Sequence, residues 1–405
     1  MNTEPSTSGL KQHGKTDWMS ILQLVFSLFV FLFFLGSAVF SAQLRVGLVP
    51  AMAPELQESM LWAYTVSLFM LALLCLPSVI SSLSAASGGN PPRWLSAPMP
   101  ALKWLPVALF VITIVIRVVI LPEEPTQGLL PAGLTALAVV LPALWFLRLG
   151  AGSQWGKNPK RNSGLLTFSL SFTTYFILIL EMVLFFAVVV GVLAALARNP
   201  QMMEVLENML PLLEGANLAP EELIELLAPL LSTPPIFIGI LLLVALVIPM
   251  IEEAFKTLGV WLLKGRGISL AEGFVAGIVS GAGFALVEGL LNSAAVASST
   301  STDWLGFVVG RLGGTLLHIF NGGLLGWAMA NAWQGKKPAK VVGIYFLTVL
   351  LHGIWNGLAI LELSPQIIAS GNLTYIFLAV YALILLVAFV LFSRKVERQA
   401  AGSTD

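Results

Sequence analysis

Residues 241–259 read LLLVALVIPMIEEAFKTLG, an apolar run that continues directly into two glutamates and a lysine. Such a run belongs inside a membrane, where a spanning helix needs about 20 mostly apolar residues. Each ionisable side chain at the membrane centre costs roughly 2.5–3.5 kcal/mol on insertion scales, so such groups usually face other helices and mark function. Glu252, Glu253 and Lys256 are therefore predicted to face the interior of a helix bundle.

The composition of the whole chain indicates a membrane protein. Of its 405 residues 57% are hydrophobic and 10% are charged, whereas soluble domains carry about 25% charged residues. The formal net charge is zero, which gives no basic surface for nucleic acid. The one cysteine, Cys75, allows neither an internal disulfide nor a cysteine-based metal site.

Apolar segments of spanning length predict an all-α fold, a polytopic membrane helix bundle with about ten transmembrane helices. The predicted spans are residues 19–43, 60–84, 104–121, 129–148, 165–197, 235–264, 269–292, 305–332, 340–362 and 373–393. The first span is too long for the apolar region of a signal peptide, roughly 7–15 residues, so we expect it to be retained.

Lysine and arginine occur in alternate connections between these spans, as they do on the cytoplasmic side of membrane proteins. They lie before the first span and after the second, fourth, sixth, eighth and tenth: Lys11, Lys15, Arg93, Lys103, Arg148, Lys157, Lys160, Arg161, Lys264, Arg266, Lys336, Lys337, Lys340, Arg394, Lys395 and Arg398. Both termini are therefore predicted to be cytoplasmic.

Four spans in the second half carry ionisable groups to one depth. At a rise of about 1.5 Å per residue, these groups lie roughly 17–24 Å from the cytoplasmic ends of their helices. They are Glu253, Glu288, His318 and His352, and Asn356 follows His352 one helical turn later. In the first half, Glu181 stands alone in the fifth span, where a structural hydrogen bond and a functional role are equally open.

Glycines recur every four residues in two of these spans, a spacing that lets membrane helices approach closely. In span 269–292 they share a face with Glu288, and in span 305–332 they share one with His318. They are Gly273, Gly277, Gly281, Gly306, Gly310 and Gly314. We expect both stripes to turn the ionisable residues toward neighbouring helices.

The residue types present exclude several kinds of hydrolase. Asp17, Asp303 and Asp405 are the only aspartates, and none lies in a predicted span, so a two-aspartate intramembrane protease is excluded. No histidine begins the HExxH zinc motif, and GIVSGAG (277–283) is not a serine nucleophile elbow. A site made of glutamates and histidines remains.

Four short motifs follow one another on successive predicted helices. EEAFK (252–256) fits E-E-x-x-K, GFALVE (283–288) fits F-x-x-x-E, RLGGTLLH (311–318) ends in a buried histidine, and HGIWN (352–356) fits H-x-x-W-N. Together they resemble the PrsW family of intramembrane proteases, distant relatives of the CAAX-prenyl endopeptidase and of bacteriocin-processing (ABI) membrane proteins. The resemblance covers about residues 247–360. Gly289 departs from it, since a polar residue is expected there.

The resemblance implies an intramembrane endopeptidase that hydrolyses a membrane protein by glutamate-activated water. It makes Glu252 and Glu253 the acidic pair, one activating water and the other engaging Lys256. Asn356 and a histidine would then stabilise the oxyanion. Glu288, His318 and His352 would supply two histidines and one carboxylate to a zinc ion, and a metal-free glutamate mechanism with the same residues stays open.

The pattern of spans divides the chain into five parts, and the resemblance identifies one of them as catalytic and suggests a setting. The parts are a cytoplasmic polar tail (1–17), five N-terminal transmembrane helices (18–198), an extracytoplasmic amphipathic helical loop (199–234), a PrsW-like catalytic four-helix core (235–362), and the last transmembrane helix with a cytoplasmic tail (363–405). The loop is expected to be a surface cap or a lid that contacts substrate. The expected partners are the lipid bilayer and a membrane-protein substrate such as an anti-sigma factor, in a bacterial plasma membrane.

Two other functions stay open at this point. Glu, His and Lys at mid-membrane also form the ion sites of proton- or ion-coupled secondary transporters. A transporter would favour paired repeats with broken helices in both halves, whereas these polar groups lie in one half. A catalytically silent scaffold of the same family is the second alternative.

Overall fold

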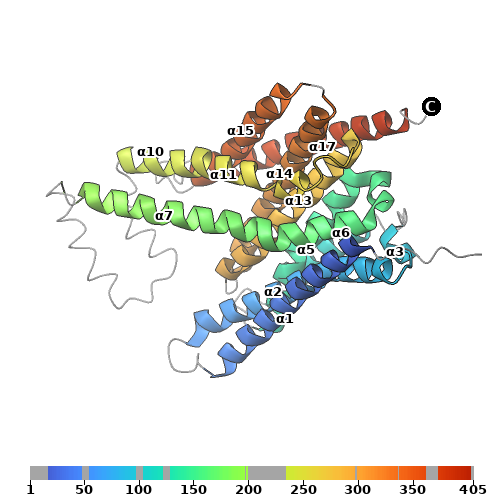
Figure 1. The fold of residues 1–405 in the computed structure, drawn as a ribbon. Helices are drawn as coiled ribbons and strands as arrows, with labels where there is room; N and C mark the ends of the chain where they lie inside the picture. Colours follow the sequence, from blue (N-terminus) through green and yellow to red (C-terminus); the bar gives the residue numbers. More distant parts are fainter. Residues whose placement is uncertain are drawn as a thin grey trace, which may run out of the picture.

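The protein is an all-α membrane helix bundle (Figure 1). This computed structural model describes residues 17–47, 54–96, 104–121, 128–196, 198, 234–296, 299–335, 337–361 and 373–402. The helices before the central gap are α1 (Trp18–Gly47), α2 (Pro54–Ala86), α3 (Arg93–Ser96), α4 (Leu105–Val115), η3 (Ile116–Ile120), α5 (Leu129–Ala151), η4 (Gly152–Lys157), α6 (Pro159–Phe168), η5 (Ser169–Thr173) and α7 (Thr174–Leu196).

The remaining helices carry the ionisable residues of the predicted site. They are α10 (Pro234–Leu242), η6 (Leu243–Val247), α11 (Ile248–Phe255), α12 (Leu258–Trp261), α13 (Leu270–Asn292), η7 (Ser293–Val296), α14 (Ser301–Trp333), α15 (Ala339–Leu361) and α17 (Leu373–Ala401). The predicted all-α, polytopic architecture is thus confirmed.

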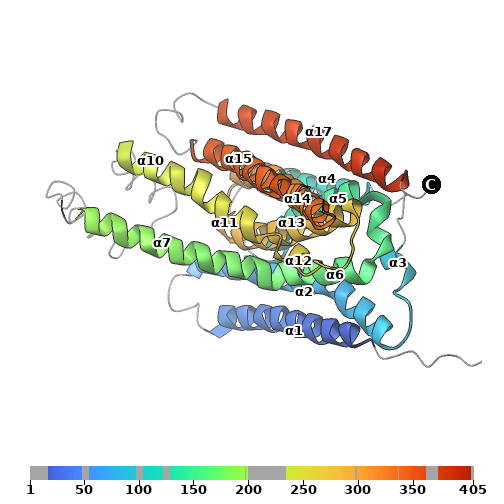
Figure 2. The same cartoon turned by 45° about the horizontal axis from the view of Figure 1, so that its top comes forward.

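Every predicted span corresponds to a helix, and eight helical segments of the described residues are long and apolar enough to cross a membrane. The segment Leu105–Ile120 is shorter, and α14 is not among the eight, so the count of ten remains a prediction. The first residues of α1 and the last of α17 lie at the same end of the bundle (Figure 2), as an even number of crossings requires. All but the last residue of the predicted tail (1–17) and of the predicted loop (199–234) lie outside the described residues.

Helix α13 lies at the centre of the bundle. In the segment Leu270–Val296, 89% of an apolar stretch of 18 residues is buried, compared with 11% of the corresponding stretch in Pro159–Gly191. Its most extensive interface is with α14, and small residues explain it. A Cβ added to Gly277 would overlap the Gly322 carbonyl oxygen, and one added to Gly281 would overlap that of His318. Close backbone approach therefore fixes α14 against α13 at the height of His318.

The predicted glycine stripe of α14 does not make this contact. Gly306 and Gly310 have nothing within 4 Å of an added Cβ, whereas Gly322 and Gly326 meet α13. Gly313 lies against the Trp355 ring of α15. Because α14 carries glycines on more than one face, its neighbours decide which of them support close packing.

Helix α10 does not continue regularly into α11. Residues Leu243–Val247 form a π-helical turn, η6, and Pro249 lies in the first turn of α11. Proline has no backbone N–H to donate and clashes with a regular helix before it, and single π turns are common at functional sites. The break lies directly before Glu252 and Glu253.

Candidate active site

Six of the predicted site residues meet in one buried network where α11, α13, α14 and α15 converge. They are Glu252, Glu253, Lys256, Glu288, His318 and His352. The close approach of α13 and α14 brings Glu288 to His318, and α15 brings His352 to α11. The depth shared by these residues in the sequence is therefore a meeting point in the structure.

Glu253 is the anchored member of the acidic pair. Its Oε1 accepts hydrogen bonds from Lys256 Nζ at 2.6 Å and Asn321 Nδ2 at 3.1 Å, and it lies 2.9 Å from His352 Nδ1. The side chains of Glu253 and Lys256 are 0% exposed. Its other oxygen, Oε2, is buried without a hydrogen-bond partner, so Glu253 differs from Glu252 in the three contacts at its Oε1, which we expect to fix its position beside Lys256.

His318 is held from the opposite side. Its Nε2 lies 3.0 Å from Glu288 Oε2, and both Glu288 oxygens accept hydrogen bonds from Arg311, at 3.0 and 2.9 Å. Gly289 lies next to this arginine: an added Cβ would clash with a Val139 methyl at 2.7 Å and would make only an ordinary contact with Arg311 Nε at 3.4 Å. The glycine that departs from the family pattern thus lies beside the guanidinium.

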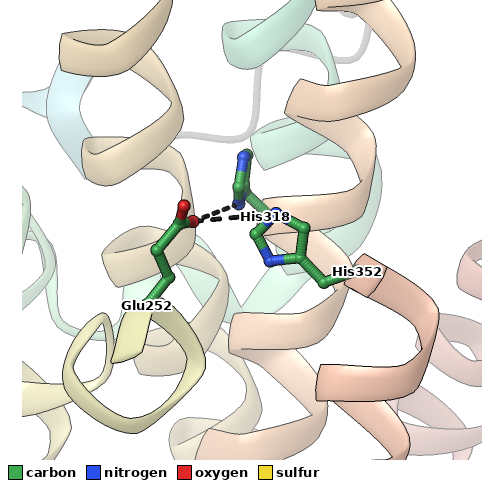
Figure 3. Close-up of side chains that lie close together, drawn as sticks. All are labelled: Glu252, His318 and His352. Carbon is green, nitrogen blue, oxygen red and sulfur yellow. Dashed lines mark ion pairs between the residues drawn. The ribbon is translucent and has the colours of Figure 1, made fainter. Parts of the chain in front are cut away.

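Glu252 is the member of the acidic pair that faces both histidines. Its Oε2 is buried and has no hydrogen-bond partner, and it lies 3.9 Å from His318 Nδ1 and 3.7 Å from His352 Nε2. Figure 3 shows the carboxylate of Glu252 pointing from α11 toward both imidazoles. A buried acceptor without a donor calls for a ligand, a water or a reacting group.

The same three residues fit a catalytic metal by their chemistry. Among the described residues, Glu252, His318 and His352 form a group whose ligand atoms lie within 4.8 Å of one another. Two histidines and a carboxylate are a known catalytic zinc set, and at zinc distances of about 2.0–2.1 Å tetrahedral ligand atoms lie roughly 3.4 Å apart. The separations of 3.7 and 3.9 Å from Glu252 to the two histidines are close to this value, and all three ligand atoms lie within 4.8 Å of one another, so small side-chain movements would complete the set.

The distal nitrogens of the two histidines complete the comparison with metal sites. Ligating histidines usually donate their other N–H to a carboxylate. Here His318 Nε2 faces Glu288 and His352 Nδ1 faces Glu253. In this arrangement Lys256 Nζ lies 2.9 Å from His318 Nδ1, so the lysine must give up this contact when Nδ1 binds a metal.

The remaining predicted residues fall differently. Asn356 lies one turn beyond His352, but its amide donates to the Val244 carbonyl at 3.0 Å instead of entering the network. Glu288 was predicted as a metal ligand, yet its oxygens bind Arg311 and the far nitrogen of His318. The carboxylate that faces both histidines is Glu252.

Sequence reasoning assigned no role to Asn321 or Arg311. Both lie on the helix of His318, Asn321 three residues after it and Arg311 seven before it. Those spacings place them on the His318 face of α14, which is the signal that could have identified them. Glu181 also interacts electrostatically with Glu252 and Glu288, and its Oε1 is buried without a hydrogen-bond partner, so α7 borders the same site.

Comparison with known proteins identifies one family. The sequence model of the PrsW family intramembrane metalloprotease matches residues 178–392, more than half of the chain. The match runs from α7 into α17 and is wider than the 247–360 range suggested by the four motifs. It contains every residue of the buried network. No curated protein and no solved structure matches the chain.

Proposed function

The chain belongs to the PrsW family of intramembrane metalloproteases and is thus a membrane-embedded peptidase. We propose that Glu252, His318 and His352 form the catalytic site at which it cleaves a peptide bond of its substrate. The observation that carries this proposal is the Glu252 carboxylate, which is buried, has an oxygen without a hydrogen-bond partner and faces both imidazoles. The transporter and scaffold alternatives have no comparable support, since the family match favours a protease.

Glu252 is proposed as the acidic residue that meets the attacking water. A water placed between Glu252 Oε2, His318 Nδ1 and His352 Nε2 would be within reach of all three atoms, which lie within 4.8 Å of one another. A carboxylate in that position orients water and accepts its proton as the peptide carbonyl is attacked. Burial of the site excludes other water that would weaken these interactions.

If the metal implied by the family is bound, the same three residues would hold it, and Glu252 would then be a ligand instead of the base described above. A bound zinc ion supplies Lewis-acid chemistry: it lowers the pKa of water to about 7 and polarises a carbonyl. The protein's own contribution is orientation. Glu253 and Glu288 each fix one histidine through its distal nitrogen, so that the facing nitrogens present lone pairs to the pocket.

Lys256 is proposed to keep Glu253 ionised and to supply positive charge near the reacting carbonyl. Its ammonium lies 2.6 Å from Glu253 and 2.9 Å from His318. Preorganised charge of this kind stabilises an oxyanion in a water-poor site. Asn356 was predicted to share that role, and its bond to Val244 favours a different one, argued below.

The substrate is proposed to be a membrane protein cleaved within or beside the bilayer. An anti-sigma factor in a bacterial plasma membrane remains the specific suggestion of the family resemblance. The catalytic core (235–362) and the loop (199–234), as cap or lid, likewise remain proposals.

The test replaces Glu252 by Gln and follows membrane proteins in cells and in vesicles. We expect an uncleaved substrate to accumulate, because Gln keeps the shape of the side chain and removes its basic oxygen. Glu58→Gln is the matched control, since Glu58 pairs with Arg45 away from the site. Unchanged membrane proteolysis in the Glu252 variant would overturn the proposed function.

A further inference from the structure

The π turn before α11 leaves the Val244 carbonyl without a helical donor. The N–H of Ile248 bonds to the Leu243 carbonyl, five residues earlier. Regular helical bonding would have directed it to Val244, and the next residue, Pro249, has no N–H. Neither donor that could reach the Val244 oxygen along the helix is available, and a backbone carbonyl inside a membrane needs one.

Helix α15 supplies the missing donor and two further contacts to the same stretch. Asn356 Nδ2 donates to the Val244 oxygen at 3.0 Å, and the Tyr345 hydroxyl donates to the Met250 oxygen at 2.9 Å. Gly353 lies so close to the Ala245 oxygen that an added Cβ would overlap it. At about 100° per residue, the three positions fall within about 80° of one another around α15.

These contacts lie close in sequence to site residues on both helices. Gly353 directly follows His352, and Ala245 lies two helical turns before Glu252, roughly 10 Å along the helix. The register between η6 and α15 therefore also sets how His352 meets Glu252. Because Gly353 has no side chain to separate the two backbones, few relative positions of η6 and α15 allow this close contact.

We propose that Asn356, Gly353 and Tyr345 form a backbone clamp that positions α11 against α15. The clamp sets the separation of Glu252 Oε2 and His352 Nε2. These three are positioning residues: they act through the backbone of residues 243–250 and do not touch the reacting atoms. The inference rests on the proposed function for its catalytic consequence, and on the backbone contacts alone for its structural one.

The first test is amide hydrogen exchange of residues 243–255 in the full-length protein in lipid nanodiscs. Asn356→Ala should exchange about two- to tenfold faster there, the ratio expected for losing one net hydrogen bond. Gly353→Ala should also exchange faster, because its added Cβ overlaps the Ala245 oxygen. Gly343→Ala and Gly357→Ala are matched controls on the same helix. An added Cβ meets nothing within 4 Å at Gly343 and only ordinary contacts, the nearest at 3.6 Å, at Gly357.

A rescue tests the carbonyl argument directly. Pro249→Ala restores an N–H that can donate to the Val244 carbonyl, five residues earlier. Asn356→Ala should therefore accelerate exchange less in the Pro249→Ala background than in the wild type. Tyr345→Phe should act in the same direction as Gly353→Ala. Tyr381→Phe is its control, because that hydroxyl donates to the Leu351 oxygen of α15 and not to α11.

Catalysis gives the second readout, with a transmembrane reporter peptide that the wild type cleaves. The clamp variants should lower kcat with little change in KM. Asn356→Ala and Tyr345→Phe should keep thermal midpoints near those of the glycine controls, whereas Gly353→Ala should have a lower midpoint, because its added Cβ overlaps the Ala245 carbonyl oxygen. Equal exchange of residues 243–255 in Gly353→Ala and Gly343→Ala would overturn the clamp. If exchange rises as expected but the wild type cleaves no reporter, the clamp stands and the proposed function fails.

Discussion

Nε2 of His318 lies 3.0 Å from Oε2 of Glu288. The same carboxylate accepts a two-point hydrogen bond from Arg311, which lies seven residues before His318 on α14. A carboxylate held at two points has one orientation, and the imidazole that faces it is oriented in turn. The Arg311–Glu288–His318 series therefore directs Nδ1 of His318 toward Glu252, as Glu253 directs Nε2 of His352 from the other side.

Replacing Arg311 should weaken the site without removing any of its reacting groups. Arg311→Gln releases Glu288, so we expect metal affinity and the cleavage rate to fall about 10–100-fold, the usual effect of losing an outer-sphere partner. Arg311→Lys should be intermediate, because lysine cannot make the two-point contact. Zinc titration with a competing chelator and the initial cleavage rate measure both effects.

The control for this prediction is Arg45→Gln, which breaks an ion pair that is partly exposed at both partners and lies between α1 and α2. Pairs of that kind contribute about 0–1 kcal/mol, so zinc affinity and cleavage should not change. Wild-type zinc affinity in Arg311→Gln would mean that His318 does not depend on Glu288 for its orientation.

Metal binding should show which glutamate, Glu252 or Glu288, joins the two histidines as a zinc ligand. A zinc chelator should abolish cleavage, and added zinc should restore it. Glu252→Gln should lose bound zinc, because Glu252 lies among the atoms that converge. Glu288→Gln should retain zinc at about 10–100-fold lower affinity, as expected for a residue behind a ligand.

Metal content of the purified variants decides between these sets. Loss of zinc from Glu288→Gln together with retention in Glu252→Gln would restore the set predicted from the sequence. Cleavage by metal-free, chelator-resistant protein would contradict both and leave the glutamate mechanism.

Close packing of α13 and α14 should depend on single glycines. Gly277→Ala places a methyl group against the Gly322 carbonyl oxygen, and overpacking of a tight contact costs about 1–3 kcal/mol. We expect a lower thermal midpoint and reduced cleavage, since His318 and Glu288 sit on these two helices. Gly310→Ala is the matched control on α14, because open space surrounds that position. Equal midpoints would show that the two backbones can separate at no cost.

The glycines also show what the sequence could and could not predict. Helix existence and the depth of Glu288, His318 and His352 follow from apolar length and rise per residue, and the structure brings those residues together. Helix rotation does not follow in the same way. Helix α14 has glycines on several faces, and only packing against α13 selects Gly322 and Gly326 over Gly306 and Gly310.

The same limit applies to the acidic residues. Motif spacing identified Glu252, Glu253 and Glu288 as a group, but their division of labour depends on which donors surround each carboxylate. Lys256 takes Glu253 and Arg311 takes Glu288, which leaves Glu252 facing the histidines. Lys256 and Glu253 are local neighbours at i,i+3, but Glu252 at i,i+4 was an equally close partner by spacing. Arg311 and Glu288 lie on different helices, and one sequence carries no direct record of such a contact.

The Glu253–Lys256 pair should show strong coupling in a double-mutant cycle. Lys256→Met leaves the Glu253 carboxylate buried without its charge partner, and breaking a buried pair in this way costs about 3–5 kcal/mol. Glu253→Gln leaves the ammonium in the same position and should cost a similar amount. The double variant Lys256→Met/Glu253→Gln buries no charge at these two positions, so its free energy of unfolding should fall by less than the sum of the single losses.

Equilibrium unfolding in mixed micelles measures all four proteins, and a coupling of about 1–3 kcal/mol is expected for groups in contact. Additive losses would mean that the ammonium and the carboxylate act independently, and that the 2.6 Å contact between them does not hold Glu253 in place behind His352.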